Sequence, residues 1–243
     1  MITLCYQPKV EARDGQLVGF EALARWDRPG VGMVSPQLFI KAAETTGLIV
    51  ELGTLLLRSA CQQIAQWQEE GIACVPVAVN VSPIQLLNSQ FPMIVVEALA
   101  EFSVPAHLLT LEITESAAVE SLEHTQSQLW KLRELGISIA MDDFGSGFSS
   151  LSMLRQLPLN AVKIDKALID PLPSVEGTAV VRAICQLSAA LGLKVVAEGV
   201  ETQQQATAAG AAGCDEFQGY FFGKPLNLAD ARALLLAKNA IAG

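Results

Sequence analysis

The sequence predicts an α/β fold, a TIM-like (β/α)8 barrel in which one strand is antiparallel. Short apolar runs alternate with amphipathic helical patterns, which is typical of a largely parallel sheet with crossover helices. The runs supply eight strand candidates, enough to close a barrel. An open doubly wound sheet is the alternative, but it would favour a Gly-rich loop after the first strand, and the chain has none there.

The predicted strands are short apolar runs, most of which lead into a polar residue. Asp14-Gly15 lies between the first two runs and is a turn signal, so these two strands are expected to pair antiparallel. The predicted strands span residues 2–6, 17–24, 75–79, 109–113, 137–141, 161–164, 194–197 and 214–217.

Six segments between the strands have helical periodicity. Gly71, Gly136 and Gly192 each follow such a segment, where a glycine suits the end of a helix. Ser35-Pro36 and Ser82-Pro83 resemble an N-cap followed by proline in the first turn. The predicted helices span residues 35–46, 50–70, 91–102, 121–135, 178–191 and 202–209.

Composition narrows the class of protein. The 243 residues are 51% hydrophobic and 17% charged, which predicts a folded chain, and we expect one domain over residues 1–243. The net charge of −9 argues against binding to a DNA or RNA duplex. The first residues do not resemble a signal peptide, and no apolar run is long enough to cross a bilayer. We therefore expect a cytoplasmic domain without membrane contact, whose five scattered cysteines are reduced thiols.

Polar residues at the strand ends are the candidates for function. In a barrel the carboxyl ends of the parallel strands converge on one face, so these side chains are expected to meet in one pocket. Glu21 would have to reach that face from a different position if the second strand were antiparallel. The candidates are Glu21, Asn80, Glu112, Asp142, Asp143, Lys163, Glu198 and Gln218.

The negative charge of such a pocket points to bound metal. Two carboxylates about 4 Å apart repel by roughly 4 kcal/mol at an effective dielectric constant of 20. Five ionised carboxylates with Lys163 as their cationic neighbour therefore require cations or protons. Carboxylate and amide oxygens suit Mg²⁺ or Mn²⁺, and the number of ligands suits two ions. Two-metal sites typically hydrolyse phosphate esters. Taken singly, Asn80 would be a helix cap or turn residue and Lys163 a surface lysine.

Eight ordered segments resemble the EAL-domain family, the cyclic di-GMP phosphodiesterases. The resemblance covers nearly the whole chain, and all the candidate residues above lie within it. Ser146 and Phe148 depart from it mildly, because Thr and Tyr are common at those positions. The segments are YQP at 6–8, FEALARW at 20–26, VNVSP at 79–83, LEITES at 111–116, DDFGSGFSS at 142–150, KID at 163–165, AEGVET at 197–202 and QGY at 218–220.

The resemblance implies hydrolysis of one phosphodiester bond of cyclic di-GMP to linear pGpG. It implies that Lys163 holds or activates the attacking water, that Leu23, Arg25 and Gln218 contact substrate or water, and that Glu115 anchors the loop starting at Asp143. We also expect activation by Mg²⁺ or Mn²⁺, inhibition by Ca²⁺, and a homodimer. A catalytically inactive cyclic di-GMP receptor and a hydrolase for another phosphodiester are the alternatives. The implied metal ligands are Glu21, Asn80, Glu112, Asp142, Asp143 and Glu198, and the implied catalytic residues are Glu21, Lys163 and Glu198.

Overall fold

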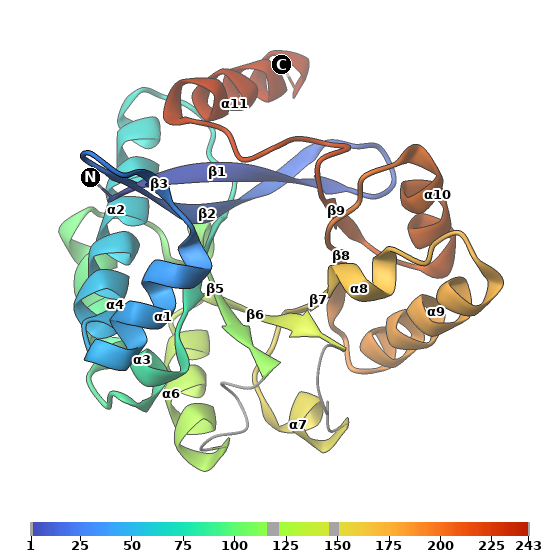
Figure 1. Ribbon diagram of the computed structural model, residues 1–243, viewed down its shortest axis with the longest axis horizontal. Coiled ribbons are helices and arrows are strands. Elements are labelled where there is room, and N and C mark those ends of the chain that lie inside the picture. Colours follow the sequence, from blue (N-terminus) through green and yellow to red (C-terminus); the bar gives the residue numbers. More distant parts are fainter. Residues whose placement is uncertain (1, 116–121, 146–150, 243) are drawn as a thin grey trace.

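A closed barrel of eight strands forms the centre of the computed structural model, which describes residues 2–115, 122–145 and 151–242 (Figure 1). The sheet order is β1-β9-β8-β7-β6-β5-β4-β2-β3, and the additional pairing of β1 with β2 closes the circle. The predicted fold is therefore confirmed, with β3 as a short extra strand on β2. The strands are β1 (Ile2–Glu11), β2 (Leu17–Arg28), β3 (Gly32–Val34), β4 (Val77–Val81), β5 (Leu109–Thr114), β6 (Ser138–Phe144), β7 (Ala161–Ile164), β8 (Lys194–Ala197) and β9 (Glu216–Gln218).

The antiparallel strand of the barrel is β1, not β2. β1 pairs antiparallel with both β2 and β9, whereas β2 pairs parallel with β4, with Glu21 opposite Ala78. The predicted antiparallel pairing of the first two strands is confirmed. Because β2 runs parallel to β4, the condition under which Glu21 would approach from a different position is not met.

Helices cover the outside of the barrel. In Figure 1, α1 to α4 and α6 gather on one side, α8 to α10 lie on the other, and α11 packs against β1. All six predicted helices are present with shifted ends, and Ser121, the expected start of one, lies outside the described residues. β3, α7, α8 and α11 were not predicted, and of α3 only the start at Ser82-Pro83 was predicted. The helices are α1 (Pro36–Thr46), α2 (Ile49–Glu69), α3 (Pro83–Leu87), α4 (Phe91–Glu101), α6 (Leu122–Glu134), α7 (Leu151–Gln156), α8 (Lys166–Ile169), α9 (Val175–Ala190), α10 (Gln203–Ala212) and α11 (Leu228–Ala242).

The caps explain where several helices begin and end. Ser82 caps α3 in a capping box with Gln85, as expected, whereas Ser35 precedes α1 without a side-chain cap hydrogen bond. Gly71, Gly136 and Gly192 all have positive φ, which glycine adopts without strain. None of the described helices combines the length and the apolar character needed to span a bilayer.

The apolar core lies between the barrel and the helices, and the barrel interior is polar. In β5, Leu109, Leu111 and Ile113 belong to the main hydrophobic core, and Thr110 and Glu112 alternate with them. Successive side chains of a strand point to opposite faces, so the residues that alternate with the core point into the barrel. Burial of each large aliphatic side chain contributes about 1.5–3 kcal/mol. The outer face thus stabilises the fold and leaves the inner face available for chemistry.

Candidate active site

Lys163 is the centre of the predicted cluster. Its side chain is 1% exposed and enters the barrel from β7, between the core residues Val162 and Ile164. The ammonium group lies 2.7 Å from Glu112 Oε2, 2.7 Å from Glu198 Oε1, 3.0 Å from Asp142 Oδ1 and 3.6 Å from Glu21 Oε2. The structure therefore brings carboxylates from β2, β5 and β6 and from the end of β8 together around one buried cation. The single-residue interpretation of Lys163 as a surface lysine is wrong.

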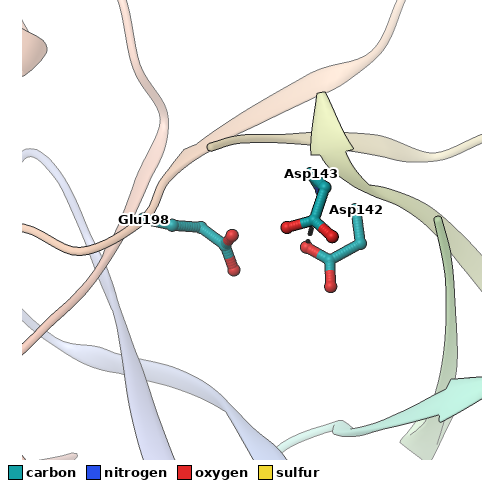
Figure 2. Close-up of side chains that lie close together, drawn as sticks. All are labelled: Asp142, Asp143 and Glu198. Atoms are coloured by element: carbon teal, nitrogen blue, oxygen red, sulfur yellow. Dashed lines mark hydrogen bonds between the residues drawn. The ribbon is translucent and has the colours of Figure 1, made fainter. Parts of the chain in front are cut away.

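Asp142 and Asp143 converge because β6 is irregular where they occur. The register of β6 against β7 shifts between Met141 and Phe144, and Asp143 has a φ of 54°, in the left-handed region that Asp tolerates better than most residues. This irregularity lets adjacent carboxylates share one side of the strand. Figure 2 shows them side by side with Glu198 pointing toward them, and ligand oxygens of the three lie within 4.8 Å of one another.

Two amides hold the carboxylate of Glu21. Asn80 Nδ2 donates to Oε1 at 2.7 Å, and Gln218 Nε2 donates to Oε2 at 2.6 Å. Gln218 Nε2 also lies 3.3 Å from Oε1 of Gln7, a buried β1 residue of the YQP segment to which the sequence analysis gave no role. Gly219 follows Gln218 in a tight backbone contact, where an added Cβ would lie 2.1 Å from the carbonyl oxygen of Val200. A glycine is required there, so it helps to fix the position of Gln218.

Lys9 is a second buried cation that the sequence analysis missed. It is 8% exposed, and its Nζ lies 3.4 Å from Glu112 Oε1. Gly19 leaves room for it, because an added Cβ would lie 3.1 Å from Lys9 Cε. The signal in the sequence is the alternation of side chains along a strand. Lys9 and Gln7 are two residues apart, so they share the inward face of β1. Glu112 is therefore held between two ammonium groups.

The cluster shares its charge unequally. Burial raises the pKa of Glu21, but Lys163 and the hydrogen bonds from Gln218 and Asn80 outweigh burial and leave it below its ordinary value. Burial raises the pKa of Glu198 well above its usual range despite Lys163. Burial also raises the pKa of Asp143, and the charge of Asp142 adds to the rise.

Burial alone would lower the pKa of Lys163, yet the surrounding carboxylates raise it well above normal. Lys163 therefore stays charged, while some of the carboxylates hold protons near neutral pH.

Glu112 gives a pH dependence of stability in the metal-free protein. Burial raises its pKa from 4.5 to about 7, against the opposing effect of Lys163. A raised pKa in the folded state contributes stability that is fully present below pH 4.5 and is lost as pH rises through 7. This loss amounts to about 3 kcal/mol at roughly 1.4 kcal/mol per pKa unit. The test is urea unfolding of the wild type and of Glu112→Gln in chelator. The difference between their free energies of unfolding, wild type minus variant, should fall by this amount from pH 4.5 to 8. A constant difference would contradict the assignment.

Two cavities lie next to the hydrogen-bonded pair of Asn80 and Glu21, one lined by each residue. One, of about 390 Å³, is lined by Glu21, Asp143, Glu198 and Gln218 together with residues that were not among the predicted site residues. The other, of about 330 Å³, is lined by Asn80 and by both remaining predicted substrate contacts, Leu23 and Arg25. These additional residues are Gln7, Asp165, Lys166, Gly199, Glu201, Gly219 and Tyr220, all but Lys166 from segments that resemble the family.

Glu115 is buried just after the end of β5. Its Oε2 meets no hydrogen-bond partner within the described ranges. Part of the loop that it was expected to anchor, including Ser146 and Phe148, lies outside those ranges. Its anchoring role stays a prediction.

The donor set fits a hard divalent metal ion. Asp142, Asp143 and Glu198 offer carboxylate oxygens close together and half-buried. Two of these carboxylates already contact a cation, because the Lys163 ammonium group lies at hydrogen-bonding distance from Asp142 and Glu198. Asn80 presents its amide nitrogen to Glu21 here, and a half-turn of that exposed amide would present its oxygen instead.

These features define a TIM-like barrel whose carboxyl-end face holds an acidic cluster around a buried lysine. Residues 1–225 match the EAL domain family, and the chain belongs to that family.

Relatives of known name share both sequence and fold with the chain. The bifunctional diguanylate cyclase/cyclic di-GMP phosphodiesterase MucR of Pseudomonas aeruginosa is 41% identical over 93% of this chain and 33% of its own length. The oxygen sensor protein DosP of Escherichia coli is 40% identical over 93% of this chain and 28% of its own length. The chain thus spans about a third of these curated relatives. A solved complex of the MucR phosphodiesterase with c-di-GMP superposes with a TM-score of 0.90, at 39% identity, covering 95% of this chain and 94% of that one.

Proposed function

We propose that this domain hydrolyses one phosphodiester bond of cyclic di-GMP to give linear pGpG. The observation that carries the proposal is the convergence of Glu21, Glu112, Asp142 and Glu198 on the buried Lys163. A receptor that only binds ligand would not need so many carboxylates to be held together against their repulsion. The MucR relative, which carries the phosphodiesterase name, supports the choice of substrate.

Residues of the cluster would hold Mg²⁺ or Mn²⁺, with the three carboxylates of Asp142, Asp143 and Glu198 as the ligands that lie closest together. Bound metal would supply charge neutralisation and acidify a water molecule. We assign Glu21, Asn80 and Glu112 to the same ligand set, which provides enough oxygens for two ions.

Lys163 would position the attacking water or a phosphate oxygen rather than take up a proton. The carboxylates around it raise its pKa, so it stays an ammonium group that can donate but cannot accept. The carboxylate of Glu198, 2.7 Å from Lys163, is the group that we assign to receive the proton of the water. The water adds to phosphorus, one ester P–O bond breaks, and the leaving oxygen takes up that proton to become the free hydroxyl of the linear product. Gln218 would keep Glu21 oriented during these steps.

Nucleotide analysis of the purified protein incubated with cyclic di-GMP tests the function. We expect pGpG with Mg²⁺ or Mn²⁺, none in excess chelator, and inhibition when Ca²⁺ competes, because Ca²⁺ prefers a larger and looser ligand shell. Binding of cyclic di-GMP without turnover would assign an inactive receptor instead. Faster cleavage of an aryl phosphodiester would assign a different substrate, and full activity in chelator would contradict the metal requirement.

Arg25 provides a test of substrate binding. It is half-buried, lines the second cavity, and donates to the carbonyl oxygen of Ala24 at 2.9 Å. Arg25→Lys should raise KM about tenfold with a much smaller change in kcat, since a hydrogen bond to a charged group contributes about 1.5–3 kcal/mol. Steady-state kinetics measure the two constants, and Arg13→Lys, on an exposed side chain, is the control. An unchanged KM would remove Arg25 from the substrate site.

The proposal takes residues 1–243 as one phosphodiesterase domain that acts as a homodimer in the cytoplasm. The thiol state of the five cysteines, all free in the structure, is compatible with a reducing compartment. Sedimentation of the purified domain would measure the oligomeric state.

A further inference from the structure

Cys185 and Cys214 form a buried thiol pair outside the candidate active site. Cys185 lies on α9, and Cys214 follows α10 on the segment that leads into β9. Their sulfur atoms are 3.7 Å apart, at hydrogen-bonding distance, and each residue is 5% exposed. The other thiols differ: Cys74, for example, donates to the backbone carbonyl of Ile72.

A close backbone approach creates the pair. Gly213 ends α10 with a φ of 111°, and an added Cβ would lie 3.2 Å from Cys185 Cβ. This glycine therefore lets the end of α10 touch α9, and the next residue, Cys214, faces Cys185. The sulfur atoms need to approach by only about 1.7 Å to reach the length of a disulfide bond.

The two thiols are chemically unequal. The hydrogen bond with Cys214 lowers the pKa of Cys185, because it stabilises the Cys185 thiolate. The same hydrogen bond raises the pKa of Cys214. Thiolate is the reactive form of cysteine, so Cys185 is the expected nucleophile and Cys214 the thiol that resolves its oxidised form.

We propose that Cys185 and Cys214 are a redox modification site that closes to a disulfide on reaction with hydrogen peroxide. The Cys185 thiolate attacks one peroxide oxygen, the O–O bond breaks, and Cys185 becomes a sulfenic acid as water leaves. Cys214 sulfur then attacks the Cys185 sulfur, and the sulfenic oxygen leaves as a second water with the proton of Cys214. Two thiols are oxidised and one peroxide is reduced. Because both cysteines are only 5% exposed, we expect a small oxidant such as hydrogen peroxide to reach them more readily than a larger one.

Peptide mapping tests the proposal independently of any phosphodiesterase activity. The folded protein is treated with hydrogen peroxide, quenched, alkylated after denaturation and digested with trypsin. Cleavage after Arg182 and Lys194 places the two cysteines on the neighbouring peptides 183–194 and 195–232. We expect these peptides joined, two hydrogens lighter than their sum, and separated again by dithiothreitol. Separately alkylated peptides after peroxide treatment would overturn the proposal.

Matched variants assign the roles of the two thiols. The linked peptides should disappear in Cys185→Ser and in Cys214→Ser, and should persist in Cys61→Ser, which removes another buried thiol. A sulfenic acid trap, dimedone, should label Cys185 in Cys214→Ser. Labelling of Cys214 in Cys185→Ser, with none of Cys185 in Cys214→Ser, would contradict the assignment of the nucleophile.

Discussion

Lys163→Met should abolish hydrolysis of cyclic di-GMP and destabilise the metal-free protein at pH 8. The substitution preserves much of the volume but leaves Glu112, which is fully buried, and its neighbours without their central cation. Breaking a buried ion pair by removing one partner costs about 3–5 kcal/mol. The loss should shrink at pH 5, because the carboxylates can then take up protons. Urea unfolding in chelator at the two pH values measures the free energy of unfolding.

Lys194→Met is the matched control. Lys194 lies at the start of β8 and forms an ion pair with Glu216 at 2.7 Å, but its side chain is 61% exposed. Exposed ion pairs contribute about 0–1 kcal/mol, so this variant should keep both its stability and its hydrolysis. Equal stability of Lys163→Met and the wild type at pH 8 would contradict the central role of the buried ammonium group.

Glu21→Gln should lower kcat by more than about 100-fold while leaving the protein folded. Loss of a group that only orients a metal ligand typically costs 10–100-fold, and a ligand itself should cost more. The stability cost should be about 1–3 kcal/mol, because Asn80 and Gln218 both donate to Glu21 and one of them would face an amide donor in the variant. Steady-state kinetics and thermal unfolding measure the two effects.

Glu70→Gln, which alters an ion pair with Arg232 on partly exposed side chains, is the control for loss of a carboxylate. It should retain wild-type hydrolysis. Metal-dependent hydrolysis at the wild-type rate in Glu21→Gln would remove Glu21 from the catalytic machinery, and therefore would count against the proposed function.

The barrel could be predicted because its strands carry the pattern in their own residues. Apolar runs, the Asp14-Gly15 turn and the helix-ending glycines are local signals, and the structure confirms the elements built on them. Elements missed in the sequence are short or have weak periodicity: α8 has four residues, and α11 is largely Ala and Leu. The hydrogen bond from the Asp230 backbone to Asn227 Oδ1 shows that a cap signal for α11 was present.

The site was predictable as a set of residues but not as a geometry. Strand ends located Glu112 and Glu198, because parallel strands bring their carboxyl ends together. The sequence could not show that Lys163 is buried, since that depends on carboxylates from four separate segments. Asp142 and Asp143 lie on the same side of β6 because the register of the strand shifts there, and no local sequence pattern encodes that shift.

β9 is the shortest strand of the barrel and links β8 to β1. β9 has three residues, of which three pair with β1 and two with β8, and Gln218 is its last residue. Because β9 forms few ladder hydrogen bonds, these bonds can open without global unfolding of the protein. Backbone amides of β9 should therefore exchange hydrogen sooner than those of β4 to β6. Each such opening would also withdraw the Gln218 amide from Glu21. The continuity of the sheet and the orientation of a candidate catalytic carboxylate are therefore governed by one local equilibrium.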